Sequence, residues 1–177
     1  MPNQLCLDLV LIVVLLVASA FDLRQRRIPN RLLAAGLLAA MVLHLSFGPA
    51  SALLTTYLAG FALGLLMFIP LYLLRGMAAG DVKLMATVGA FLCPSLVFQA
   101  SLATYVCGGL LALLIVFFKR RASDAFANVF ALLLPMLLRF QGVRLAPTAA
   151  RAGSVGGMPY AVAISCGTLF VLWLRHT

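Results

Sequence analysis

The chain has 177 residues, 64% of them hydrophobic, and a mean hydropathy of +1.14. A soluble core of this size does not need so much apolar surface, so the composition excludes a soluble globular protein and indicates an integral membrane protein, with residues 1–177 forming one domain. The net charge of +9 does not indicate a nucleic-acid partner, because Lys and Arg flank the apolar segments as they do in cytoplasmic loops.

The first apolar segment predicts a spanning helix over about 5–21. Arg24 and the basic residues after it follow this helix, which places its end in the cytoplasm and the N-terminus outside. Ala18-Ser19-Ala20 resembles a signal-peptide cleavage site, but no Lys or Arg precedes the apolar run, so we expect the helix to be retained. Pro29 and Asn30 suit the start of the next helix.

Further spanning helices are predicted from the remaining apolar segments. Gly60-x-x-x-Gly64 indicates a close-packing face within one of them, and Pro70 a kink near its inner end. The C-terminus is expected outside, like the N-terminus. The predicted ranges are about 31–47, 52–74, 81–92, 96–118 and 158–174, which makes the fold class all-α with about six transmembrane helices.

The stretch 122–157 is predicted to be a cytoplasmic loop. It has an apolar helical stripe but is too short between its polar ends to span, and a span here would break the charge rule. An interfacial helix is the preferred interpretation.

Asp22 and Asp81 are predicted to lie at the same inner edge of the membrane. Two apolar stretches, about 32–48 and 52–74, separate them, and an even number of crossings returns the chain to the side it left. Carboxylates at membrane depth are costly and indicate function, and each has the other as its natural partner. The pair is the outline of an intramembrane aspartyl protease, in which one carboxylate activates water and the other, protonated, polarises the scissile carbonyl.

Each carboxylate also has a structural interpretation. Asp22 would be an interfacial residue beside Arg24, and Asp81 a helix N-cap after Gly80. Asp8 is interpreted as an outer-end residue and Asp124 as a cap.

Other polar and aromatic residues are assigned no catalytic role. His44 and His176 are expected near the outer face, and Tyr160 and Trp173 as interface anchors. The four cysteines are far apart and lack a C-x-x-C spacing, so we expect no disulfide framework, no metal and no cofactor.

Three blocks of residues together resemble the prepilin peptidases, a family of type IV prepilin leader peptidases. The blocks are Asp22-Leu23-Arg24-x-x-x-Ile28-Pro29-Asn30, Gly76-Met77-Ala78-Ala79-Gly80-Asp81-Val82-Lys83-Leu84 and Pro159-Tyr160. The resemblance implies a GxGD-type aspartyl protease fold, catalysis by Asp22 and Asp81 on the cytoplasmic side, and no metal. The larger members' methyltransferase segment with paired C-x-x-C motifs is not present, so the chain is similar to the short type associated with Flp pili and tight-adherence secretion.

The first glycine of the family's G-x-G-D motif is Ala78 in this chain. If that position needs a positive φ, alanine carries a steric penalty; if it needs only a small residue, alanine is adequate. Gly80 either allows a substrate backbone to approach or is a flexible residue before the helix. Lys83 is expected near Asp81, where it would bias the pair electrostatically or meet lipid phosphates.

The expected function is an endopeptidase of the bacterial inner membrane that trims leaders from prepilin or pseudopilin precursors, with pilus or secretion machinery as further partners. Two rivals stay open. The chain would otherwise be a non-catalytic membrane subunit that docks pilins, which the Ala78 departure favours, or a small transporter whose carboxylates relay protons.

Overall fold

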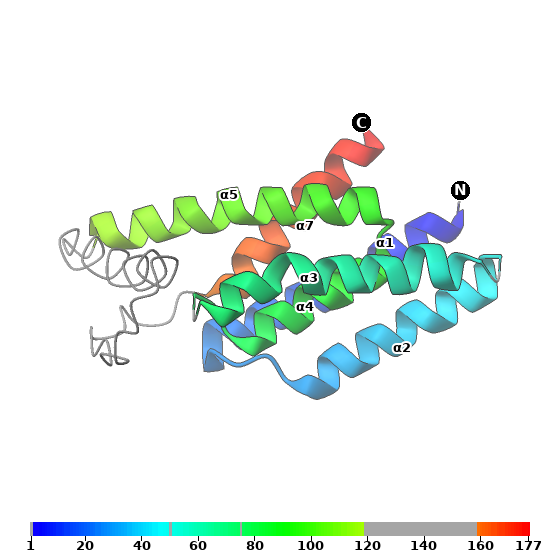
Figure 1. Cartoon of the computed structure of the whole chain (residues 1–177), viewed down its shortest axis with the longest axis horizontal. Helices are drawn as coiled ribbons and strands as arrows, with labels where there is room; N and C mark the ends of the chain where they lie inside the picture. Colours follow the sequence, from blue (N-terminus) through cyan, green and yellow to red (C-terminus); the bar gives the residue numbers. More distant parts are fainter. Residues whose placement is uncertain (1, 50, 75, 119–158) are drawn as a thin grey trace, which may run out of the picture. The chain divides into compact units, whose positions relative to one another are not determined.

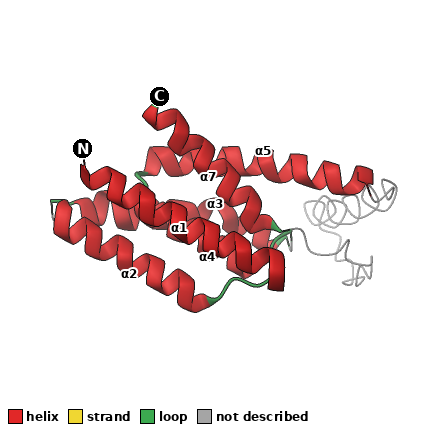
Figure 2. Cartoon of the chain, turned by 180° about the vertical axis from the view of Figure 1, so that it is seen from behind, coloured by secondary structure: helices red, strands yellow, loops and turns green. Residues whose placement is uncertain are grey.

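The computed structural model describes residues 2–49, 51–74, 76–118 and 159–177. These residues form helices and short connections without strands, which confirms the all-α prediction (Figures 1 and 2). The predicted interfacial helix in 122–157 lies outside the described residues. The elements are α1 (Pro2–Gln25), α2 (Asn30–Phe47), the π-helix η1 (Leu53–Leu58), α3 (Ala59–Leu73), α4 (Ala79–Phe91), α5 (Pro94–Phe118) and α7 (Tyr160–His176).

The chain divides into two compact units. Unit 1 comprises residues 1–109 and 159–177, and unit 2 comprises residues 110–158, of which the structure describes the end of α5. Both termini lie at the same end of this unit, where Asp8 of α1 accepts hydrogen bonds from Arg175 and His176 of α7 (Figure 1).

Four of the described helices are long and apolar enough to cross a membrane: Gln4–Gln25, Asn30–Phe47, Leu53–Leu73 and Pro94–Ile115. The fold is therefore that of a membrane protein. α7 is apolar but shorter, and α4 has only 13 residues, or about 20 Å of helix. The expected number of six crossings stays a prediction.

α4 is the helix around which unit 1 is built. It contacts α1, α2, η1, α3 and α7. From Asp81 to Phe91 all its residues are buried except Lys83. A helix enclosed in this way needs no lipid-facing surface, which is why it can be short.

α3 and α4 pack with their backbones in direct contact. A Cβ atom added to Gly60 would lie 2.0 Å from the carbonyl oxygen of Gly89, and one added to Gly64 would lie 2.5 Å from that of Met85. Any side chain at these glycines would push the helices apart. The close-packing face predicted from Gly60-x-x-x-Gly64 is confirmed, with α4 as its partner.

Two helix boundaries near the predicted site differ from the sequence prediction. α1 continues to Gln25, so Asp22 lies in its last turn, and Arg26 ends the helix with a left-handed φ of 52°. α4 begins at Ala79 with Ala78 at the N-cap, so Asp81 is the third helical residue and the N-cap interpretation is wrong. A carboxylate in the first turn is also favoured by the helix dipole, so residue type alone does not distinguish the two positions.

His44 caps the C-terminal end of α4. The carbonyl of Ala90 would normally accept a hydrogen bond from the N–H four residues later, but that residue is Pro94, which has none. The Nε2–H of buried His44 on α2 donates to this carbonyl at 3.0 Å instead. His44 therefore has a structural role at the end of unit 1 that carries the termini.

We expect Gly60→Ala to destabilise the protein by at least about 2 kcal/mol, because the new methyl group overlaps the backbone of α4. Thermal unfolding in detergent measures the effect. The matched control is Gly109→Ala on α5, where an added Cβ meets no atom of the described residues within 4 Å and alanine is the better helix former. Equal stability of the two variants would contradict the α3–α4 contact.

We expect His44→Leu to lower the free energy of unfolding by about 1–3 kcal/mol, because it leaves the carbonyl of Ala90 buried without a donor. His44→Gln keeps a donor and should lose less. The same thermal measurement applies. A leucine variant as stable as the wild type would show that the hydrogen bond does not cap α4.

Candidate active site

Asp22 is buried where the last turn of α1 meets the first turn of α7. Its side chain is 6% exposed, and its Oδ2 accepts a hydrogen bond from the backbone N–H of Ala161 at 3.0 Å. Ala161 is the second residue of α7, where backbone N–H groups have no partner within the helix. A buried carboxylate and a helix start therefore satisfy each other across 139 positions of sequence.

Asp81 is equally buried and is held by the start of its own helix. Its Oδ2 accepts a hydrogen bond from the N–H of Ala78 at 3.3 Å, and its own N–H donates to the carbonyl of Ala78 at 3.1 Å. This is the carboxylate half of a capping box. Ala78 has no side-chain oxygen to supply the other half.

The two carboxyl groups are close enough for the charge of Asp22 to act on Asp81. Helices α1 and α4 are in contact with each other, and both contact α7. Among the described residues the hydrogen bonds to each carboxyl group use only Oδ2, which leaves each Oδ1 available to a water molecule or a substrate. The structure thus brings together the two aspartates that the sequence singles out.

The backbone conformation of Ala78 shows whether this position needs the positive φ that glycine would allow. Its φ is −81° and its ψ is 153°, an extended conformation that any residue can adopt. Alanine is therefore unstrained where the family has glycine. The backbone conformation at this position does not require glycine.

Gly80 lies on the first turn of α4 beside Ile28, which comes from the connection after α1. A Cβ added to Gly80 would lie 3.6 Å from the nearest atom of Ile28, an ordinary van der Waals distance. The packing of the described residues does not require glycine at this position.

The other predicted support residues form a link between α2 and α4. Exposed Lys83 donates a hydrogen bond from Nζ to Oδ1 of Asn30 at 3.3 Å, and the structure shows no ion pair between Lys83 and Asp81 within the described ranges. Pro29 is the N-cap residue of α2, and its carbonyl accepts from the N–H of Leu32 at 3.1 Å. These residues fix the start of α2 near α4 without touching the carboxyl groups.

Tyr160 lies differently from the interface anchor that the sequence suggests. It is partly buried at the start of α7, where a Cβ at Gly108 of α5 would lie 3.2 Å from its phenol oxygen. Asp81 is near enough to act on it electrostatically. Trp173, by contrast, is 62% exposed, as an anchor would be.

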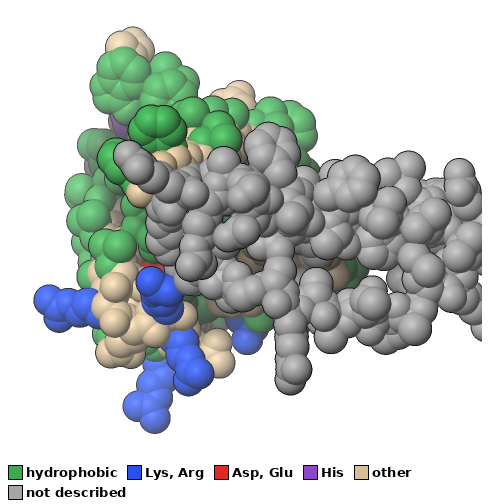
Figure 3. Space-filling model, turned by 90° about the vertical axis from the view of Figure 1, so that its left-hand side faces the viewer, with side chains coloured by type: hydrophobic (Ala, Val, Ile, Leu, Met, Phe, Trp, Pro, Cys, Tyr) green, Lys and Arg blue, Asp and Glu red, His purple; other side chains and the backbone are tan. Residues whose placement is uncertain are grey.

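Basic side chains gather at the end of unit 1 where α1 finishes and α2 begins (Figure 3). The exposed residues here are Arg24, Arg26, Arg27, Arg31 and Lys83. Of the Lys and Arg residues that the structure describes, only Arg175 lies at the end with the termini. This one-sided distribution is the positive-inside pattern, and the carboxyl pair shares its end with the basic residues.

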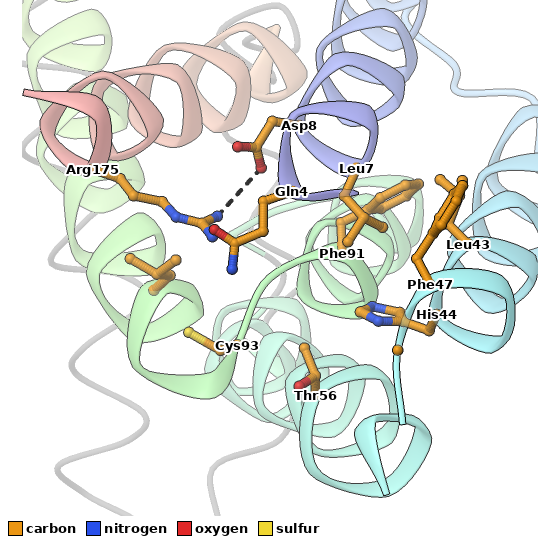
Figure 4. Close-up of a pocket in the computed structure, with 12 residues that line it drawn as sticks. Gln4, Leu7, Asp8, Leu43, His44, Phe47, Thr56, Phe91, Cys93 and Arg175 are labelled. Atoms are coloured by element: carbon orange, nitrogen blue, oxygen red, sulfur yellow. Dashed lines mark hydrogen bonds and ion pairs between the residues drawn. The ribbon is translucent and has the colours of Figure 1, made fainter. Parts of the chain in front are cut away.

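A cavity of about 510 Å³ lies at the opposite end of unit 1, where Asp22 and Asp81 do not line it (Figure 4). Three of its polar side chains have partners in the fold: Asp8 binds Arg175 at 3.4 Å, and His44 caps α4. His176 also pairs with Asp8, at 3.0 Å. The expectation that both histidines are remote from the site is therefore confirmed.

The described residues contain no group of three or more His, Cys, Asp or Glu side chains that could hold a metal ion. The expected absence of a metal and a cofactor stays a prediction. The chemistry available at the site is that of two buried carboxyl groups, one of which is within electrostatic reach of the other.

The partners of Asp22 could not be found by reading the sequence. The N–H of Ala161 belongs to the backbone, so the residue type at this position does not reveal it as a donor. Ser19 and Ser165, which link α1 to α7 beside Asp22, look like ordinary small residues of membrane helices. A short helix beginning at Pro159-Tyr160 was the only signal at this position.

The model of the type IV leader peptidase family matches residues 9–113. No curated protein and no solved structure matches the chain. The matched region contains Asp22, the Ile28-Pro29-Asn30 segment and the Gly80-Asp81 motif, and it stops before α7. Because it covers more than half of the 177 residues, the chain belongs to the type IV leader peptidase family.

Proposed function

We propose that this protein is an aspartic endopeptidase of the bacterial inner membrane, which removes the leader peptide from type IV or Flp prepilin-like precursors. The observation that carries the proposal is the pair of buried carboxyl groups, Asp22 and Asp81, within electrostatic reach of each other at one end of unit 1. Membership of a leader peptidase family supports it.

The proposed reaction uses the two groups in different protonation states. Two like charges at short distance in a buried site cannot both ionise easily, so the pair shares a proton. One carboxylate then takes a proton from the attacking water, while the other, as the acid, polarises the scissile carbonyl. Each group is anchored through Oδ2, so Oδ1 is the oxygen that works on water or substrate.

The position of the scissile bond in the proposed substrate matches the end of unit 1 at which Asp22 and Asp81 lie. A prepilin has a basic leader that stays in the cytoplasm and an apolar helix that lies in the membrane, with the scissile bond after a glycine between them. Asp22 and Asp81 share their end of unit 1 with the basic residues, which the positive-inside pattern assigns to the cytoplasm. The termini at the other end would then both be outside.

The rival role as a non-catalytic docking subunit loses its main support. It rested on Ala78 in place of glycine, and the extended backbone at Ala78 needs no glycine. A transporter would need a pathway past the carboxyl groups. The described cavity lies at the other end and does not include them.

We expect Asp22→Asn and Asp81→Asn each to abolish cleavage, because an amide can neither activate water nor donate a proton as a carboxylic acid does. The double variant should be little worse than either single one, since the two residues act as a unit. The assay is conversion of a co-expressed pilin precursor to its mature form, read by gel shift.

The matched control is Asp8→Asn, which also removes a buried carboxylate from α1 but at the end remote from the pair. It should cleave like the wild type once membrane levels are equalised. Processing that survives Asp81→Asn at equal protein level would falsify the protease assignment.

We expect Gly80→Ala to fold normally, because the free protein has room for the methyl group and alanine favours a helix by up to about 1 kcal/mol. If Gly80 is where the substrate backbone approaches the pair, the same change should raise KM or lower kcat by about 10-fold or more. Unchanged kinetics in a protein of unchanged stability would show that Gly80 is only the start of a helix.

A further inference from the structure

Two serines join α1 and α7 directly beside the Asp22 hydrogen bond. The hydroxyl oxygens of Ser19 and Ser165 are 2.7 Å apart, and the Ser165 hydroxyl donates to the carbonyl of Leu15 at 3.3 Å. If Ser19 donates to Ser165, which in turn donates to Leu15, both hydroxyl protons are used. The Ser19 hydroxyl also lies 3.4 Å from the carbonyl of Ala161.

The spacing of these residues makes a two-rung connection. Ser19 precedes Asp22 by three residues on α1, and Ser165 follows Ala161 by four on α7, so each pair shares a helix face. One rung is the Asp22–Ala161 hydrogen bond, and the other is the Ser19–Ser165 contact about one turn away. The side chain of Ser165 is 5% exposed, so water does not readily replace its partner.

This connection between α1 and α7 determines the position of the Asp22 carboxyl group. Its carboxyl group is held by a donor on another helix, and that donor stays in place only while α7 keeps its register against α1. Asp81 does not depend on α7 in this way, because its donor is the start of its own helix. A shift of α7 would therefore move one member of the pair relative to the other.

We propose that Ser19 and Ser165 are positioning residues, which hold the start of α7 against α1 and so orient the carboxyl group of Asp22 for the reaction. The inference rests on the proposed function. Neither serine touches the substrate. Their effect is on the rate of the chemical step, not on substrate binding.

The first test compares serine-to-alanine variants in the cleavage assay with purified protein and a precursor peptide. Ser19→Ala and Ser165→Ala should lower kcat about 10- to 100-fold with KM within about threefold, because displacement of a catalytic group affects the transition state. The double variant should resemble the single ones, since both remove the same rung.

The matched control is Ser101→Ala. Ser101 is fully buried, but its hydroxyl donates to Val97 within the same helix, α5. Its loss removes a buried hydroxyl without loosening α1 from α7, so kcat should stay within about twofold of the wild type. Equal losses of kcat in the Ser19, Ser165 and Ser101 single variants, or a rise in KM alone, would overturn the proposal.

The second test replaces the hydrogen bond by a covalent one. Ser19→Cys and Ser165→Cys are combined in a background in which the four native cysteines are changed to alanine. Hydroxyl oxygens 2.7 Å apart place the new thiols near the roughly 2 Å of a disulfide. Oxidation should cross-link the pair and keep kcat at the level of the cysteine-free parent; reduction should lower it about 10-fold, and reoxidation should restore it.

The outcomes separate this inference from the proposed function. A wild type that does not cleave contradicts both. A cleaving wild type with unaffected serine variants contradicts only the positioning role. Failure of the two cysteines to cross-link contradicts the α1–α7 contact itself, with no reference to activity.

Discussion

The fold has to bury two carboxyl groups at one end of a helical unit and still give each a hydrogen-bond donor. An unpartnered carboxylate in such a place costs several kcal/mol or takes up a proton, so the donors are part of the site. Both come from helix starts, where backbone N–H groups lack partners. Asp81 uses the start of α4, and Asp22 uses the start of α7. For Asp22 this requires that α7 begins beside the last turn of α1.

Much of this arrangement is predictable from local patterns. Hydropathy predicts the helices, the even number of crossings predicts that Asp22 and Asp81 share an end, and Gly60-x-x-x-Gly64 predicts a backbone contact. These features depend on residue type and short spacings. The partner of each contact is not predictable in the same way: that Gly60 meets Gly89, or that His44 meets the carbonyl of Ala90, depends on how helices far apart in sequence are brought together.

Ala78 shows that the backbone conformation decides whether a motif position requires glycine. A glycine in the motif of the resembled family suggests a left-handed conformation, and the sequence could not exclude that requirement. The extended backbone found at Ala78 removes it, while Gly60 and Gly89 need glycine because another backbone occupies the space of a Cβ. The backbone thus accommodates a residue other than glycine at position 78, whereas a side chain at Gly60 or Gly89 would overlap another helix. Only the neighbouring atoms distinguish the two cases.

The two ends of unit 1 are stabilised by different means. At the end with the termini, Asp8 pairs with Arg175 and accepts a hydrogen bond from His176, and His44 caps α4. At the other end, the donors that the described residues supply to the carboxyl groups are backbone N–H groups, and exposed Lys83 pairs with Asn30. An ion pair with Lys83 would fix Asp81 as a carboxylate, whereas neutral N–H donors leave the pair able to hold one proton. Within the described residues no ion pair holds Asp22 or Asp81 as a carboxylate, and this is compatible with the acid and base roles proposed for the pair.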